Sequence, residues 1–449
     1  MVIKKKLFLV LFIFLGLGIS YLLFYSWMKM GYSSQISKIH KTGYPVTPEE
    51  LEKWYPEPPS GQNAAYFYMK AADNYKRKPD NVDEKLLIIQ GGCVELPSTG
   101  ISFLEEIIKN SEAYLEANQE SLEFLHKAVE FKSCRYPVEV ENPDRRLDYL
   151  SNLRHGARLL STEAILAVEK GDSEKALKSL IAAVALSSSL EMEPTIDSFV
   201  VMMGTEHIAL ENFERILNRC KFNAVQLKQL SAKFAVFDEM KTLERAFAGE
   251  RTYIFSGHAL EEYLEYADYN FPIIRKNKVL KKSFEFMADF LLLWMMNELA
   301  SADLVSELIE LCKGTPESAL LKTDAIQERI CNLPSRLYAT KLYIPRMLPL
   351  IDKKAMTIAE VRVARVGLAL VLFRLKNGRL PETLSELVPA HIESIPADPM
   401  DAKPLRYRKA EKEALVYSVG ADGIDNGGNS GNNNGIAKGE DFVLRISNP

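Results

Sequence analysis

The chain has 449 residues, of which 47% are apolar and 26% charged, with a formal net charge of −4 at pH 7. This composition is ordinary for a globular protein and leaves room for two or three domains. A slightly acidic chain has no basic field to attract phosphate backbones, so nucleic acid is not an expected partner.

The first predicted element is an uncharged, strongly apolar stretch over residues 7–27. As a helix it would be about 31 Å long, enough to cross a hydrocarbon core of about 30 Å. We therefore predict a transmembrane anchor over residues 7–27, preceded by a cytoplasmic tail over residues 1–6 that carries Lys4, Lys5 and Lys6. The remaining chain is then expected outside a bacterial inner membrane, in the periplasm.

A cleaved signal peptide is the alternative for the same stretch. Gly18 and Ser20 supply small residues at a suitable spacing for cleavage. The apolar run continues past that point through Tyr21 and Phe24, which favours an uncleaved anchor. Both interpretations export the rest of the chain.

Residues 28–62 are predicted to be a connector, because prolines interrupt them repeatedly. Thr47 is placed to cap a short helix over residues 49–54, with Pro48 at its first position. The five cysteines lie far apart and form no CxxC pair, which argues against a zinc site or a redox pair. We expect buried free thiols, since unpaired cysteine is commonly buried, with one or two disulfides as the alternative.

Residues 63–350 are predicted to form an α-helical domain, because apolar residues recur at spacings of three and four. The helical patterns cover residues 64–75, two runs within 103–131, and residues 195–217, 224–247, 258–266, 279–299 and 302–313.

The clearest helical pair lies over residues 153–183. One face of the first helix is predicted to hold Leu153, Ala157, Leu160, Ala164 and Ala167, and the facing stripe of the second to hold Ala176, Leu180 and Ala183. Gly171 is suited to end the first helix and Asp172 to cap the second. This spacing resembles one tetratricopeptide repeat, with no second copy one period later. An ordinary antiparallel helical hairpin explains it equally well.

Residues 352–449 are predicted to be a small α+β domain. Apolar residues from Met356 to Phe373 form a stripe along one long helix, which Asn377 and Gly378 should end. Two strand-like runs follow, over residues 414–419 and 441–446, joined by a loop rich in glycine and asparagine. The fold class expected for the whole chain is thus mainly α, with a helix on an antiparallel sheet at its C-terminal end.

This last part resembles the soluble domain of the major pseudopilin of type II secretion systems. The resemblance covers about 95 residues and rests on residues 376–381, 387–389, 396–399, 404–408, 417–423 and 440–442. The whole chain also resembles large exported bacterial proteins of unknown function that carry such a tail. It departs from true pseudopilins in having no acid in its apolar helix, and about 325 residues separate that helix from the tail.

The loop that joins the two strand-like runs is the candidate metal site. The pseudopilin resemblance implies calcium near this loop, and Asp422, Asp425 and Asp441 are the candidate ligands by position. Calcium takes six to eight oxygen ligands, which this loop is rich in. A flexible polar hairpin loop would have the same composition, since asparagine and glycine also serve turns.

No short catalytic signature is present. The six histidines form no HExxH motif, and the chain has no GxSxG, P-loop or GxGxxG motif. The charged pair Glu206 and His207 is interpreted as intrahelical ion pairing. We therefore expect a non-enzymatic structural or interaction protein with protein partners in the cell envelope. The alternative is an exported enzyme of the hydrolase type, with its site in the helical domain.

Overall fold

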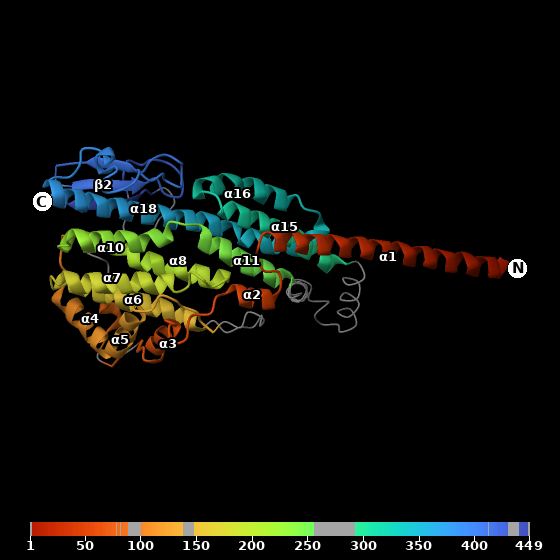
Figure 1. The fold of residues 1–449 in the computed structure, drawn as a ribbon, viewed down its shortest axis with the longest axis horizontal. Helices are drawn as coiled ribbons and strands as arrows, with labels where there is room; N and C mark the ends of the chain where they lie inside the picture. The colour runs from red at the N-terminus through yellow and green to blue at the C-terminus, as the bar shows by residue number, and fades with distance from the viewer. Residues whose placement is uncertain are drawn as a thin grey trace. The chain divides into compact units, whose positions relative to one another are not determined.

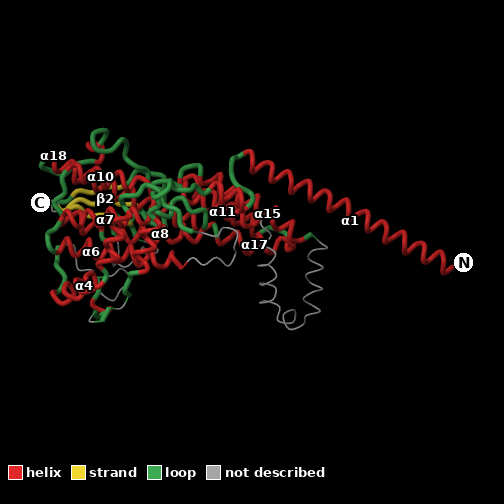
Figure 2. Tube along the Cα trace, turned by 60° about the horizontal axis from the view of Figure 1, so that its bottom comes forward, coloured by secondary structure: helices red, strands yellow, loops and turns green. Residues whose placement is uncertain are grey.

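The computed structural model describes residues 2–77, 79–80, 82–88, 100–137, 148–255, 292–411, 413–429 and 440–447. The described chain is mainly helical and contains one small antiparallel sheet, which confirms the expected coarse fold class (Figures 1 and 2). The predicted helix over residues 258–266, most of that over 279–299, and residues 430–439 of the candidate metal loop lie outside the described residues.

The chain divides into two compact units, each assembled from separate segments. Unit 1 consists of Met1–Trp54, Phe247–Glu310 and Asp324–Leu348, and unit 2 of Tyr55–Ala246, Leu311–Thr323 and Pro349–Pro449. The domain ranges drawn from the sequence stay predictions.

Unit 1 contains α1 (Val2–Lys41), α2 (Pro48–Trp54), α17 (Tyr338–Tyr343), and parts of α11 (Lys241–Phe255), α15 (Leu293–Cys312) and α16 (Pro316–Cys331). Thr47 caps α2 as predicted, because its hydroxyl oxygen accepts a hydrogen bond from the Glu50 amide at 3.3 Å. Helix α1 continues past Trp27 to Lys41, so it includes the first part of the expected connector. Within the described residues, no helix combines the length and the apolar character that a membrane span requires.

Unit 2 begins with α3 (Ala65–Asp73), α4 (Glu105–Ala117), α5 (Gln119–Ala128), α6 (Asp148–Glu169) and α7 (Ser173–Ser188). The predicted hairpin is confirmed in α6 and α7: Gly171 has φ of 74°, and the Asp172 carboxylate accepts a hydrogen bond from the Lys175 amide at 2.9 Å. Ala157 and Ala176 are fully buried, as expected for small residues where two helices meet closely. Helices α8 (Ile196–Glu211), α9 (Phe213–Arg219) and α10 (Ala224–Phe234) follow.

The C-terminal part of unit 2 consists of α18 (Leu348–Asn377) and the strands β1 (Arg406–Lys409), β2 (Glu413–Ser418) and β3 (Phe442–Ser447). The strand order is β1-β2-β3 and both pairings are antiparallel. The predicted long helix is confirmed and ends before Gly378, where φ is 70°. The two predicted strands are each displaced by one residue, and the sequence analysis did not predict β1.

The outer edge of β3 is bonded to side chains of α9. The Glu214 carboxylate accepts a hydrogen bond from the Arg445 amide at 2.9 Å, and the Asn218 side chain bonds both the Arg445 carbonyl oxygen (2.7 Å) and the Ser447 amide (2.8 Å). An unpaired strand edge invites pairing with another chain. Here helical side chains occupy that edge, so the sheet belongs to the same compact unit as α9.

The four cysteines that the structure describes are all free. Cys312 is buried, Cys134 and Cys220 are half-buried, and Cys331 is exposed. The expectation of buried thiols is therefore right for Cys312 and wrong for Cys331.

Candidate functional site

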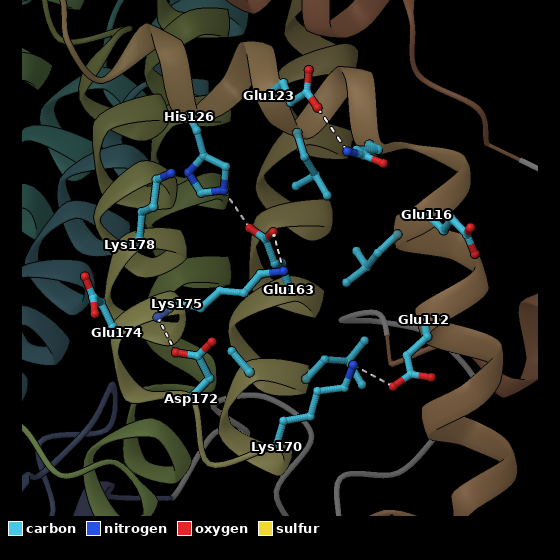
Figure 3. Close-up of a pocket in the computed structure, with 15 residues that line it drawn as sticks. Glu112, Glu116, Glu123, His126, Glu163, Lys170, Asp172, Glu174, Lys175 and Lys178 are labelled. Atoms are coloured by element: carbon cyan, nitrogen blue, oxygen red, sulfur yellow. Dashed lines mark hydrogen bonds and ion pairs between the residues drawn. The ribbon is translucent and has the colours of Figure 1, made fainter.

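The candidate site is an open pocket of about 850 Å³ between α4 and α5 on one side and α6 and α7 on the other (Figure 3). Four apolar residues contribute to its lining: Leu115, Leu122, Leu166 and Ala167. This volume lies in the range of ligand pockets, which pair an apolar lining with a few placed polar groups. The pocket can therefore hold a small molecule or part of a polypeptide.

Acidic side chains outnumber basic ones around this pocket. The lining holds the carboxylates Glu112, Glu116, Glu123, Glu163, Asp172 and Glu174 against the lysines Lys170, Lys175 and Lys178, a net charge of −3 with His126 neutral. Two of the lysines are held by carboxylates of the lining: Lys170 lies 2.7 Å from Glu112, and Lys175 lies 3.4 Å from Glu163. The pocket therefore favours a ligand that carries positive charge.

Glu163 is the most enclosed charged group of the pocket and organises its polar side. One of its oxygens is 2.7 Å from His126 Nε2 and accepts a hydrogen bond from the Ser179 hydroxyl at 2.8 Å. Burial raises the pKa of Glu163, but the hydrogen bonds from His126 and Ser179 and the charges of His126 and Lys175 outweigh it and hold the pKa below its usual value. Glu163 is thus an ionised group that fixes side chains from α5 and α7.

The His126 ring is bonded on one side only. Its Nδ1 atom is buried and has no hydrogen-bond partner among the described residues. A general base must reach the proton that it takes from the substrate. Because Nε2 is bonded to Glu163 and Nδ1 is buried, His126 and Glu163 join α5 to α6 on the polar side of the pocket.

We expect Glu163→Gln to destabilise unit 2 by about 2 kcal/mol at pH 7, because it removes charged hydrogen bonds in a buried place. A carboxylate with a lowered pKa contributes stability above its unfolded pKa, and that contribution is lost as the pH falls through its lower folded pKa. The difference from wild type should therefore shrink below pH 4. Denaturant unfolding at pH 7 and pH 3.5 measures it. Glu174→Gln, an exposed residue of the same lining, is the control and should change stability by less than about 0.5 kcal/mol.

The three residues predicted to bind calcium make local hydrogen bonds in the C-terminal loop. Asp422 accepts a hydrogen bond from the Ile424 amide at 3.0 Å, and Asp425 accepts one from the Gly427 amide at 2.9 Å. The two oxygens of Asp441 accept hydrogen bonds from the amides of Asn426 (3.2 Å) and Gly428 (2.7 Å). Asp425 and Asp441 therefore hold the same short segment, while Asp422 bonds within its own turn.

Among the residues that the structure describes, no group of three or more histidine, cysteine, aspartate or glutamate side chains is arranged to hold a metal ion. In its described part, the loop uses its aspartates as the polar hairpin alternative would use them. A calcium site at Asp422, Asp425 and Asp441 would need further oxygens.

Asp398 is a buried carboxylate that the sequence analysis did not single out. It accepts hydrogen bonds from the Ser418 hydroxyl (2.8 Å), the Val419 amide (2.9 Å) and Arg406 Nη1 (3.2 Å). These contacts join the turn before β1 to the end of β2. The signal in the sequence was the Pro-Ala-Asp-Pro segment over residues 396–399, in which Asp398 is the only side chain that can accept several donors.

Sequence reasoning also missed the pocket itself. Its residues come from four helices and from the turn between α6 and α7, and only Asp172 and Ala167 had been singled out, for capping and for packing. Comparisons with protein-family models, with curated proteins and with solved structures found no match to this chain.

Proposed function

We propose that this protein is a membrane-anchored binding protein of the bacterial cell envelope without catalytic activity, and that the pocket between α4, α5, α6 and α7 receives a basic segment of a protein partner. The observation that carries the proposal is the surplus of carboxylates around an apolar lining, where Lys170 and Lys175 are already paired with Glu112 and Glu163. A lysine or arginine side chain suits this lining, since its stem is apolar and its head is charged.

Exposed apolar side chains on α1 support the membrane anchor. Phe12 is 68% exposed and Leu23 is 67% exposed, and Leu15, Leu22 and Trp27 are also largely exposed. In Figures 1 and 2 the N-terminal half of α1 extends beyond the other described helices of unit 1. Contiguous exposed apolar surface of this kind marks a membrane or protein contact. The proposal places residues 7–27 in the inner membrane, residues 1–6 in the cytoplasm and the rest in the periplasm.

The pseudopilin-like part, residues 352–449, is proposed to serve as a structural contact in an envelope or secretion assembly. The proposal includes calcium binding at Asp422, Asp425 and Asp441, which rests on the oxygen-rich sequence of the loop. We expect calcium to raise the melting temperature of the wild type, and Asp422→Ala to remove that rise. Differential scanning fluorimetry with and without calcium tests it, and an unchanged melting temperature of the wild type would contradict the calcium site.

The second candidate function is an exported enzyme of the hydrolase type, and the pair His126 and Glu163 is the observation that favours it. The buried Nδ1 atom of His126 counts against it, because a general base must reach the proton that it takes. A reaction that persists in His126→Gln would exclude this pair as its catalytic group.

Photo-crosslinking from intact membranes tests the docking proposal. A photoreactive amino acid replaces Gln119 in the pocket lining, and the control replaces Val225 on α10, which is 75% exposed and lies outside the lining. We expect one dominant protein adduct from position 119 and none of that size from position 225. Equal adduct patterns from the two positions would contradict the proposal.

Charge reversal tests whether the pocket recognises a positively charged segment of the partner. Glu116→Lys changes the lining, while Glu120→Lys makes the same change on α5 outside it. We expect the adduct at position 119 to fall at least fivefold with Glu116→Lys and to stay unchanged with Glu120→Lys. An adduct that grows with Glu116→Lys would indicate an acidic partner.

A further inference from the structure

Helix α1 packs against the beginning of α15 within unit 1. Met28 forms a buried cluster with Leu292 and Met295. Five further side chains pack around this cluster: Tyr21 and Tyr32 of α1, and Trp294, Met296 and Leu299 of α15. The first turn of α15 therefore lies beside the part of α1 between Tyr21 and Tyr32.

This contact reaches into the segment proposed to lie in the membrane. Tyr21 precedes Trp27, the last residue of the proposed span, by six positions, which is about 9 Å along a helix. A helix that packs on Tyr21 must therefore reach the membrane surface or enter the bilayer. Residues 292–296 read Leu-Leu-Trp-Met-Met and carry no charge, so nothing in that turn opposes an apolar environment.

Aromatic residues cluster where α1 meets the first turn of α15. Tyr21, Tyr25 and Trp27 lie on α1, and Trp294 lies on the facing turn of α15. Tyrosine and tryptophan are enriched where membranes meet water, because each joins an apolar ring to a polar group. Their position here is the one expected for a protein surface at the outer headgroup layer.

Glu298 lies one turn beyond Trp294 and is 1% exposed. Neither of its carboxyl oxygens has a hydrogen-bond partner among the described residues, and burial raises the pKa of Glu298 to about 7. A carboxyl group that is partly neutral at pH 7 fits a place next to a low-dielectric layer.

We propose that the half-buried side chains of the first turn of α15, Leu293, Trp294 and Met296, form a second membrane contact beside α1 at the outer headgroup layer. Its partner is the lipid bilayer, and it holds unit 1 against the membrane. The inference rests on the proposed anchor over residues 7–27, and it adds a second segment through which the protein contacts the membrane.

The three tryptophans of the chain supply the test, because each lies in a different place in unit 1. Full-length variants that keep only Trp27, Trp54 or Trp294, with phenylalanine at the other two positions, are reconstituted into phosphatidylcholine vesicles. Lipids brominated on the acyl chain quench tryptophan only at short range. We expect Trp27 and Trp294 to lose at least half of their fluorescence. Trp54, the last residue of α2, packs against Tyr44 and should lose less than a tenth.

The possible results distinguish a failure of the second membrane contact from a failure of the proposed anchor. Quenching of Trp27 without quenching of Trp294 would overturn the second contact and leave the anchor in place, while quenching of neither would overturn both. Wild type and the single variant Trp294→Phe provide a second measurement that needs only one substitution. The variant should show a smaller quenched fraction than wild type, and equal fractions would overturn the proposal.

Discussion

Lys354→Met is expected to lower the free energy of unfolding of unit 2 by roughly 3–5 kcal/mol, the cost of removing one partner of a buried ion pair. Lys354 lies on α18 and is 0% exposed. Its Nζ atom donates a hydrogen bond to the Phe237 carbonyl oxygen at 3.0 Å and lies 3.9 Å from a carboxyl oxygen of Glu206. Methionine has a similar length and no charge, so the substitution removes the charge and keeps most of the volume.

The loss should be larger at alkaline than at acidic pH. Burial raises the pKa of Glu206 to about 7, Lys354 opposes that rise, and the neighbouring carboxylates Glu360 and Glu191 add to it. A carboxyl group with a raised pKa costs stability as the pH rises from its unfolded pKa through its folded pKa. Without Lys354 the pKa of Glu206 rises further, so this cost continues to grow above pH 7.

Denaturant unfolding at pH 5 and pH 8.5 measures this difference. The double variant Glu206→Gln with Lys354→Met is the control, because it removes both charges. We expect it to recover at least half of the stability that Lys354→Met loses at pH 8.5, as partners in contact are not additive. A loss that is equal at both pH values, with no recovery in the double variant, would show that Lys354 acts through its hydrogen bond to Phe237 and not through Glu206.

Features set by neighbouring residues were predictable from the sequence. Thr47 caps α2, Gly171 and Asp172 separate α6 from α7, and Gly378 ends α18, all as expected. Each signal acts within a few residues, through a side-chain cap or a positive φ that glycine adopts without strain. Such chemistry does not depend on the rest of the fold.

Contacts between distant helices were not predictable from the sequence. Glu206 lies 3.9 Å from Lys354, and His207 Nδ1 lies 3.4 Å from Glu360, both on α18. Glu211, one turn along α8, also raises the pKa of His207. Two charged residues of α18 show this as well: Lys354 is fully buried, and Arg362 is bonded to Asp238 and Glu317. Helical periodicity separates apolar from polar residues, but it does not say which polar residues meet a partner more than a hundred positions away.

The pocket was unpredictable for a related reason. Glu163 and Ser179 are polar residues inside an apolar hairpin and bond each other, and only the position of α5 brings His126 against Glu163. Whether a buried carboxylate is satisfied depends on donors from other elements. The sequence therefore predicted the hairpin and left the site beside it unseen.

Gly420→Ala is expected to destabilise the C-terminal sheet by roughly 3–5 kcal/mol. This is the sum of two costs, that of a forced backbone shift and that of a non-glycine residue in the left-handed conformation. Gly420 has φ of 69°, and a Cβ atom at this position would lie 2.1 Å from the backbone carbonyl oxygen of Glu440. Gly420 follows β2 and Glu440 precedes β3. Relieving the clash therefore requires a shift of the paired ends of β2 and β3, Ser418 and Phe442.

Gly423→Ala is the matched control, because Gly423 has nearly the same backbone conformation, with φ of 67°. A Cβ atom there would meet only the Met400 carbonyl oxygen, at an ordinary 3.8 Å. This variant should cost about 1–2 kcal/mol, the price of the left-handed conformation alone.

Amide hydrogen exchange in β2 and β3 distinguishes the two variants. In Gly420→Ala, the amides at the end of β2 and the start of β3 should lose protection at least a hundredfold, whereas Gly423→Ala should change them by about tenfold or less. Equal losses would mean that the left-handed conformation accounts for both effects. The close approach of Gly420 to Glu440 would then not add to the cost of a side chain at position 420.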